Sequence, residues 1–158
     1  PDNYQSLYKL GSVYTTLANV ESELLGAQIK SKEPNDALMT RYDSAMRSCT
    51  QLALDTYQKL ERLWPEYAEL PYNLSMINNR IAEIKRYDAR LKQAGESNGS
   101  RAETDSDFTQ LSIDAWDDEA LRYAERMYAM SQKYEVAELL GQQLMHMART
   151  AEDAGDEQ

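Results

Sequence analysis

The most regular stretch of the chain is residues 113–151, which read IDAWDDEALRYAERMYAMSQKYEVAELLGQQLMHMARTA. Apolar or small residues recur there in alternating steps of three and four: Ile113, Trp116, Ala120, Tyr123, Met127, Met130, Tyr134, Ala137, Gly141, Leu144, Ala148 and Ala151. This a/d heptad pattern places one uncharged stripe along a helix. We therefore predict a single helix of about 40 residues, about 60 Å long at 1.5 Å per residue. A hairpin with its turn near residues 131–133 is the alternative, although neither Gly nor Pro stands there.

Three earlier segments show the same spacing. Residues 3–30 carry the first stripe: Leu10, Val13, Leu17, Val20, Leu24 and Ala27. The second segment begins at Asn35 or Asp36, both good N-cap residues, and ends at Trp64 before Pro65. Its stripe contains Leu38, Tyr42, Ala45, Cys49, Leu52 and Thr56. Residues 72–93 carry the third stripe: Leu74, Ile77, Ile81, Ile84 and Leu91. We expect each stripe to face the other helices of a bundle.

The third segment also carries charges that need partners. Asp88 interrupts its stripe, so this carboxylate either lies in water near the helix end or pairs with a nearby Arg, which can fix the register. The segment holds the basic cluster of the chain: Arg80, Lys85, Arg86, Arg90 and Lys92. Because acidic residues interleave this cluster and no aromatic platform accompanies it, nucleic-acid binding is not expected. We expect the cluster to face the acidic last segment, within the molecule or across a dimer.

Together the segments predict an all-α fold, an elongated antiparallel helical bundle of about four long helices with coiled-coil-like heptad packing. Residues 1–95 form a three-helix antiparallel bundle in this interpretation. Residues 96–107 are polar and have no apolar period, so they form a flexible linker or long loop. Residues 108–152 form the long acidic heptad helix or a helical hairpin, and residues 153–158 form an acidic tail.

Several fragments resemble tetratricopeptide repeats, which are stacked helical hairpins. The matching fragments are Leu10-Gly11 with Tyr14, Ala53–Lys59 with Pro65, Ala68-Glu69 with Tyr72–Ser75, and Tyr128 with Tyr134 and Ala137. The resemblance implies a short helical-repeat solenoid whose concave face binds peptides. Because the fragments do not keep the family's period of about 34 residues, the solenoid is the alternative to the bundle.

The net charge of −10 belongs to the C-terminal part of the chain. Residues 1–95 contain 12 acidic and 12 basic side chains, whereas residues 96–158 contain 15 acidic and 5 basic ones. Such an acidic stretch repels nucleic acid and anionic membranes and attracts basic partners. No apolar run approaches the roughly 20 residues that span a bilayer, so direct membrane insertion is not expected.

The sequence offers few groups for catalysis. His146 is the only histidine, which excludes paired-histidine metal sites. Cys49 is the only cysteine and falls on an apolar stripe, where we expect a buried small hydrophobe. The acids at the start of the last segment suit the positive end of a helix dipole: Asp114, Asp117, Asp118 and Glu119. We therefore expect no catalytic residue, no metal and no cofactor, and hence no enzyme.

One cysteine excludes an intramolecular disulfide, which is compatible with the cytoplasm. We favour a cytoplasmic location, although a chain that begins at Pro1 is also what removal of an upstream targeting or anchoring segment would leave.

Long helices without catalytic motifs favour a non-catalytic protein–protein interaction module, such as an adaptor, scaffold, secretion chaperone or assembly subunit. The last segment combines the acidity, a group of methionines and the longest stripe. We expect six of its residues to bind a partner, either a second copy in a homodimer or a basic protein: Trp116, Tyr123, Met127, Met130, Tyr134 and Leu144. One alternative is an acidic decoy protein that mimics DNA and inhibits a DNA-binding protein. Another is a carboxylate-dependent enzyme, which would need a pocket of converging acids.

Overall fold

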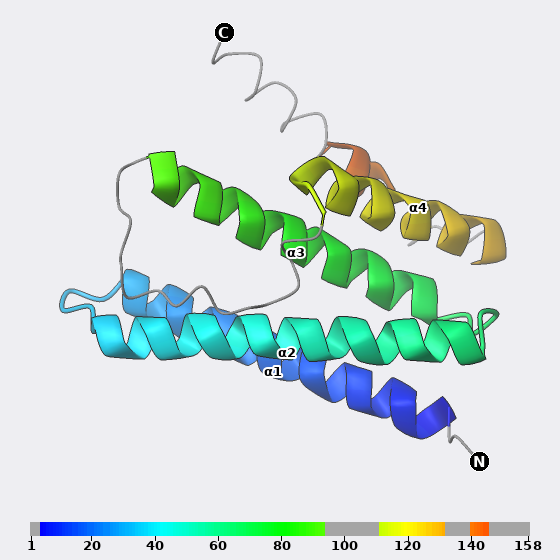
Figure 1. Ribbon diagram of the computed structural model, residues 1–158, viewed down its shortest axis with the longest axis horizontal. Helices are drawn as coiled ribbons and strands as arrows, with labels where there is room; N and C mark the ends of the chain where they lie inside the picture. The colour runs from blue at the N-terminus through cyan, green and yellow to red at the C-terminus, as the bar shows by residue number, and fades with distance from the viewer. Residues whose placement is uncertain (1–3, 94–110, 132–139, 146–158) are drawn as a thin grey trace, which may run out of the picture.

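The computed structural model describes residues 4–93, 111–131 and 140–145. They form an all-α bundle, which confirms the predicted fold class (Figure 1). Its long helices are α1 (Tyr4–Ile29), α2 (Asp36–Leu63), α3 (Leu70–Gln93) and α4 (Ile113–Ser131). The bounds of α1, α2 and α3 agree with the sequence prediction to within two residues at each end.

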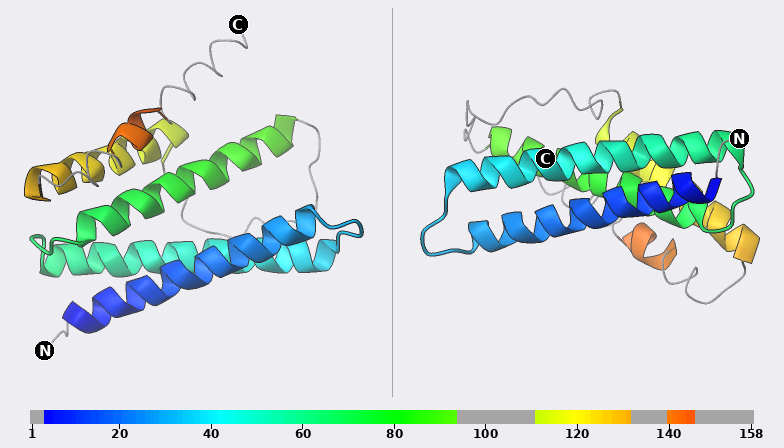
Figure 2. Two further views of the ribbon diagram at one scale, coloured as in Figure 1. Left: turned by 180° about the vertical axis from the view of Figure 1, so that it is seen from behind. Right: turned by 90° about the horizontal axis from the view of Figure 1, so that it is seen from below.

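The helices are stacked in chain order, and each runs antiparallel to the next (Figures 1 and 2). The most extensive packing joins α1 to α2 and α4 to α3, and a smaller contact between α2 and α3 links the two pairs. This order follows from the short connections between the first three helices, which favour antiparallel neighbours. It also makes α1 and α4 the outer helices of the stack.

Capping residues set several helix ends. Asn35 is the N-cap of α2, and its Oδ1 accepts a hydrogen bond from the backbone N–H of Leu38 at 3.0 Å. α2 ends just before Trp64, because Pro65 disfavours helical geometry in the residue that precedes it. At the start of α4, Ser112 Oγ accepts from the backbone N–H of Ala115 at 3.2 Å.

The main core lies between α2, α3 and α4. The stripe predicted for residues 72–93 is confirmed, because four of its members are buried: Leu74, Ile77, Ile81 and Ile84. α2 contributes another buried set, namely Met46, Ala53, Leu54, Tyr57 and Leu60. These α2 residues flank the stripe predicted for that helix, of which Leu52 is exposed. α2 is therefore rotated about its axis relative to the sequence prediction.

An aromatic cluster joins the first turns of α1 to the connection between α2 and α3. Its ring centroids lie 5.0 Å apart for Tyr8 and Tyr67, 5.1 Å apart for Trp64 and Tyr67, and 5.5 Å apart for Tyr4 and Trp64. The three pairs are tilted, an arrangement that is favourable between aromatic rings. The cluster accounts for part of the high tyrosine content, because three of its four rings are tyrosines.

The single helix predicted for residues 113–151 is wrong. α4 is described to Ser131, and the helical residues 140–145 lie level with the first half of α4, not beyond its end (Figures 1 and 2). A continuous helix would place residue 140 about 14 Å farther along the same axis. The two segments therefore belong to separate helices. The predicted linker 96–107 and the acidic tail lie outside the described residues.

Candidate functional site

α1 turns a row of buried residues toward α2, two of which are small. Its buried residues are Gly11, Ala18 and Leu25, each one heptad from the next. Ala18 has no exposed surface. Small side chains at this spacing allow two antiparallel helices to approach closely, because little volume separates the backbones.

Gly11 packs directly against the ring of Tyr57 on α2. A Cβ atom at this position would lie 2.6 Å from the ring carbon Cε1 of Tyr57. Tyr57 has no exposed surface, and the ring of Tyr8 packs beside it with the centroids 6.1 Å apart. The ring therefore has little room to move aside, so a larger residue at position 11 would force α1 away or rotate it.

The rotation of α1 leaves its heptad stripe on the outside of the bundle. The exposed fractions are 42% for Leu10, 53% for Val13, 44% for Leu17, 45% for Val20 and 40% for Leu24. We call these five residues the α1 stripe. The expectation that this stripe faces the other helices of the bundle is wrong. The small residues Gly11 and Ala18 occupy the bundle side instead.

Few charges border the α1 stripe. The charged residues of α1 are Lys9, Glu21 and Glu23, of which Lys9 and Glu23 are exposed and Glu21 is half-buried. Within the part of the chain that the structure describes, neither Lys9 nor Glu23 forms an ion pair. The outer face of α1 is thus a long apolar strip, and beside it lie Lys9 and Glu23, which have no ion-pair partner among the described residues.

The residues expected to bind a partner on the last segment do not form one exposed surface. Three of them are buried, with exposed fractions of 5% to 7%: Trp116, Tyr123 and Met127. Met130 and Leu144 are exposed, and Tyr134 lies outside the described residues. The seam of α4 is therefore covered within the chain, chiefly by α3, which corrects the expectation that α4 presents this seam to a partner.

The basic cluster of α3 is divided among different neighbours. Arg86 forms an ion pair with Asp117 of α4, as expected for a cluster that faces the last segment. Arg80 instead donates a hydrogen bond to Oδ1 of Asn19 on α1. Burial lowers the pKa of Arg80, and the nearby Glu83 opposes this effect.

Lys85 of α3 contacts the segment that precedes α4. Lys85 donates a hydrogen bond to the backbone carbonyl of Leu111, just before α4 begins. Arg90 is exposed, and the side chain of Lys92 lies outside the described part of the chain. The described contacts of Arg80, Lys85 and Arg86 therefore join α3 to other parts of the bundle.

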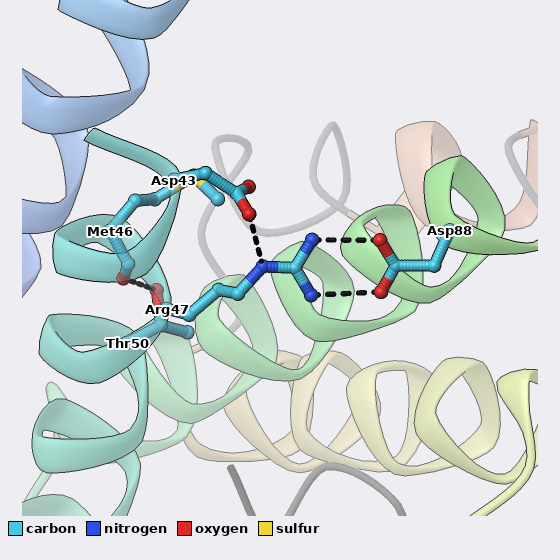
Figure 3. Close-up of polar contacts among 5 residues, drawn as sticks. All are labelled: Asp43, Met46, Arg47, Thr50 and Asp88. Carbon is cyan, nitrogen blue, oxygen red and sulfur yellow. Dashed lines mark hydrogen bonds and ion pairs between the residues drawn. The ribbon is translucent and has the colours of Figure 1, made fainter. Parts of the chain in front are cut away.

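Asp88 pairs with an arginine that the sequence did not single out (Figure 3). Arg47 of α2 donates to both carboxylate oxygens of Asp88, at 2.8 and 2.7 Å, and to Asp43 at 2.9 Å. Burial alone would lower the pKa of Arg47, but the hydrogen bonds to Asp88 and Asp43 outweigh it and hold the pKa above its ordinary value. The pairing alternative for Asp88 is confirmed, and it ties α2 to α3.

The candidate reactive groups are not assembled into a site within the described residues. Cys49 is half-buried, and burial together with the negative charge of Glu21 raises the pKa of its thiol. A thiol held in the protonated form is a poor nucleophile. No group of three or more His, Cys, Asp or Glu side chains in the described part could hold a metal ion. His146 lies outside this part.

None of the described helices is long and apolar enough to cross a membrane.

No protein-family model, curated protein or solved structure matches the chain. The resemblance to tetratricopeptide repeats therefore has no support from a family match. Helix length also argues against it, since α1, α2 and α3 have 26, 28 and 24 residues. A repeat of about 34 residues must hold two helices and two turns, so each of its helices is much shorter.

Proposed function

We propose that this protein is a non-catalytic interaction module that binds another protein through the α1 stripe. The observation that carries the proposal is the outward position of an a/d heptad stripe, with each of its five residues at least 40% exposed. Exposed apolar surface that is continuous over several turns is uncommon on monomers and typically marks an interface.

The shape of the stripe favours a helix as the partner. An a/d spacing allows the side chains of one helix to insert between those of another, which is the packing of a coiled coil. The leucines Leu10, Leu17 and Leu24 alternate with the valines Val13 and Val20, so the strip is narrow and regular. A second amphipathic helix would bury such a strip along its whole length.

The proposal keeps the predicted class of function and moves the interface to a different helix. On α4 the corresponding residues support the fold, because Trp116 and Tyr123 are part of the core. On α1 the stripe adds less to the fold, because the helix is held to α2 by the face that carries Gly11, Ala18 and Leu25. We therefore assign partner binding to α1, whereas the sequence had led us to expect it on the last segment.

Two of the described acids of α4 do not support the acidic decoy alternative. Asp117 is paired with Arg86, and Glu119 is paired with Arg122. A carboxylate that is neutralised by an arginine does not imitate a free phosphate. We therefore do not extend the proposal to DNA mimicry.

The test compares glutamate substitutions at matched exposed positions. The stripe variant carries Val13→Glu and Leu17→Glu, and the control carries Met130→Glu on α4, where the side chain is 42% exposed. The apparent mass of each tagged chain is measured by size-exclusion chromatography in extracts of the cells that encode it. We expect the wild type and the control to elute within a larger assembly and the stripe variant to elute at its own mass. An assembly that survives in the stripe variant would contradict the proposal.

A further inference from the structure

We propose that the α1 stripe binds the α1 stripe of a second copy of this chain, in antiparallel orientation, with Lys9 of each copy facing Glu23 of the other. The inference rests on the proposed function, because it names the partner of the same surface. It is carried by the exposed stripe together with the two exposed charges of opposite sign beside it.

These two charges are placed symmetrically on one edge of the stripe. Lys9, Thr16 and Glu23 are exposed, and each is one heptad from the next. All three occupy the g position when Leu10 and Leu17 are assigned to a. In an antiparallel pair, the g edges of the two helices face one another. A twofold axis beside Thr16 therefore brings Lys9 opposite Glu23 of the second copy, and the same pair recurs on the other side of the axis.

The same axis matches the apolar side chains. Leu10 faces Val20 of the second copy, and Val13 faces Leu17. Because the axis repeats each contact, four successive layers have an apolar side chain from both helices. The surface is then complementary to itself, which is the requirement for a closed twofold dimer.

Other arrangements of two α1 helices bring fewer opposite charges together. A parallel pair would place Lys9 near Tyr14 and Glu23 near Gln28, so no opposite charges would meet. An antiparallel pair shifted by one heptad would cover Leu24 more fully, but it would face Lys9 with Lys30 of the second copy. A strongly charged partner would gain no net attraction from the g edge of α1, because the charges of Lys9 and Glu23 are opposite. The symmetric placement of Lys9 and Glu23 thus favours the second copy and one register.

The first test measures self-association of the purified full chain by sedimentation velocity over a range of concentrations. We expect a reversible dimer for the wild type and a monomer for the variant that carries Val13→Glu and Leu17→Glu. Both substituted positions are exposed, so circular dichroism should show unchanged helix content. A wild type that remains monomeric at high concentration, or a dimer that persists in the variant, would overturn the inference.

The second test reverses the charges that set the register. Lys9→Glu should weaken the dimer about tenfold, because it turns two attractive pairs into two repulsive ones. Adding Glu23→Lys to this variant should restore the wild-type dissociation constant. Lys59→Glu is the matched control on α2, where Lys59 is exposed, and it should have little effect. Failure of the double variant to recover would exclude the Lys9–Glu23 pairing.

The third test traps the orientation in a chain whose native thiol is removed by Cys49→Ala. Thr16→Cys lies beside the proposed axis, so a short bismaleimide should link the two copies. Glu23→Cys alone should not be linked, since its two copies lie about 20 Å apart along the helices at 1.5 Å per residue. Linkage of Glu23→Cys to itself would show a parallel pair. Linkage that needs a mixture of Thr16→Cys and Glu23→Cys would show the shifted register, and either result would overturn the proposed arrangement.

The inference and the proposed function can fail separately. If the purified chain is monomeric but the stripe variant still loses its assembly in cell extract, the partner is a different protein and only the inference fails. If the stripe variant changes neither measurement, both fail.

Discussion

Gly11 shows how one residue decides which face of a helix is buried. A side chain at this position would meet the buried ring of Tyr57 at less than van der Waals distance. The face of α1 that carries Gly11 can therefore lie closest to α2, and the apolar stripe must turn away from the bundle. The orientation of the proposed interface thus depends on an atom that glycine lacks.

Gly11→Ala should destabilise the protein by about 1 to 2 kcal/mol. Overpacking a buried contact costs about 1 to 3 kcal/mol, and the better helix propensity of alanine returns up to about 1 kcal/mol. Gly26→Ala on the same helix is the matched control, because its Cβ would have no atom within 4 Å. The control should be neutral or stabilising by up to about 1 kcal/mol. Urea unfolding measures both, and equal effects of the two substitutions would contradict the close contact.

Arg47→Ala should cost about 3 kcal/mol, because it leaves Asp43 buried without its partner and frees Asp88. Arg122→Gln tests an exposed ion pair on α4, that of Arg122 with Glu119, and should change stability by less than about 1 kcal/mol. Thermal unfolding of the two variants gives the comparison. If Arg47→Ala loses no more stability than Arg122→Gln, the ion pairs drawn in Figure 3 contribute little to the stability of the fold.

At the scale of the helix, periodicity predicted where α1, α2 and α3 begin and end, because proline and capping residues mark those points in the sequence. It also predicted the buried face of α3. It failed for α1, since a heptad stripe indicates an apolar helix face and does not specify whether that face packs against the other helices of the chain. The signal that was missed is the heptad spacing of Gly11, Ala18 and Leu25, which suits a close approach.

Leu17 and Leu74 both lie on predicted stripes, but their side chains differ strongly in burial. Leu17 is 44% exposed and Leu74 has no exposed surface. Leu17→Ala should cost less than about 1 kcal/mol in the monomer, whereas Leu74→Ala should cost about 2 to 5 kcal/mol. The measurement is urea unfolding at a dilution where the chain is monomeric. Similar losses for the two variants would place the α1 stripe inside the bundle after all.

At the scale of the whole molecule, tyrosines on several elements resist ionisation. Burial, together with a hydrogen bond to Glu69, raises the pKa of Tyr8 to about 12. Burial likewise raises the pKa of Tyr57, and burial with a hydrogen bond to Glu61 raises that of Tyr123. Below a pH of about 10 these tyrosines are neutral in both the folded and the unfolded chain. Their ionisation therefore does not reduce the free energy of unfolding in that range.

Stability should therefore fall as the pH rises above about 10, where the unfolded chain releases these protons and the folded chain holds them. We expect a lower urea midpoint at a pH of about 11 than at about 9. Tyr123→Phe should reduce this dependence, since it removes one of the groups. A midpoint that does not change over this range, or a slope that Tyr123→Phe leaves unaltered, would contradict the assigned burial.

We propose above that α1, and not the last segment, contacts the partner. The most direct measurement places a photo-cross-linking amino acid at Val13 or at Met145, which are 53% and 57% exposed, and irradiates cells that express each chain. We expect position 13 to yield a cross-linked species of higher mass and position 145 to yield none. A cross-link that forms at position 145 but not at position 13 would contradict the proposal.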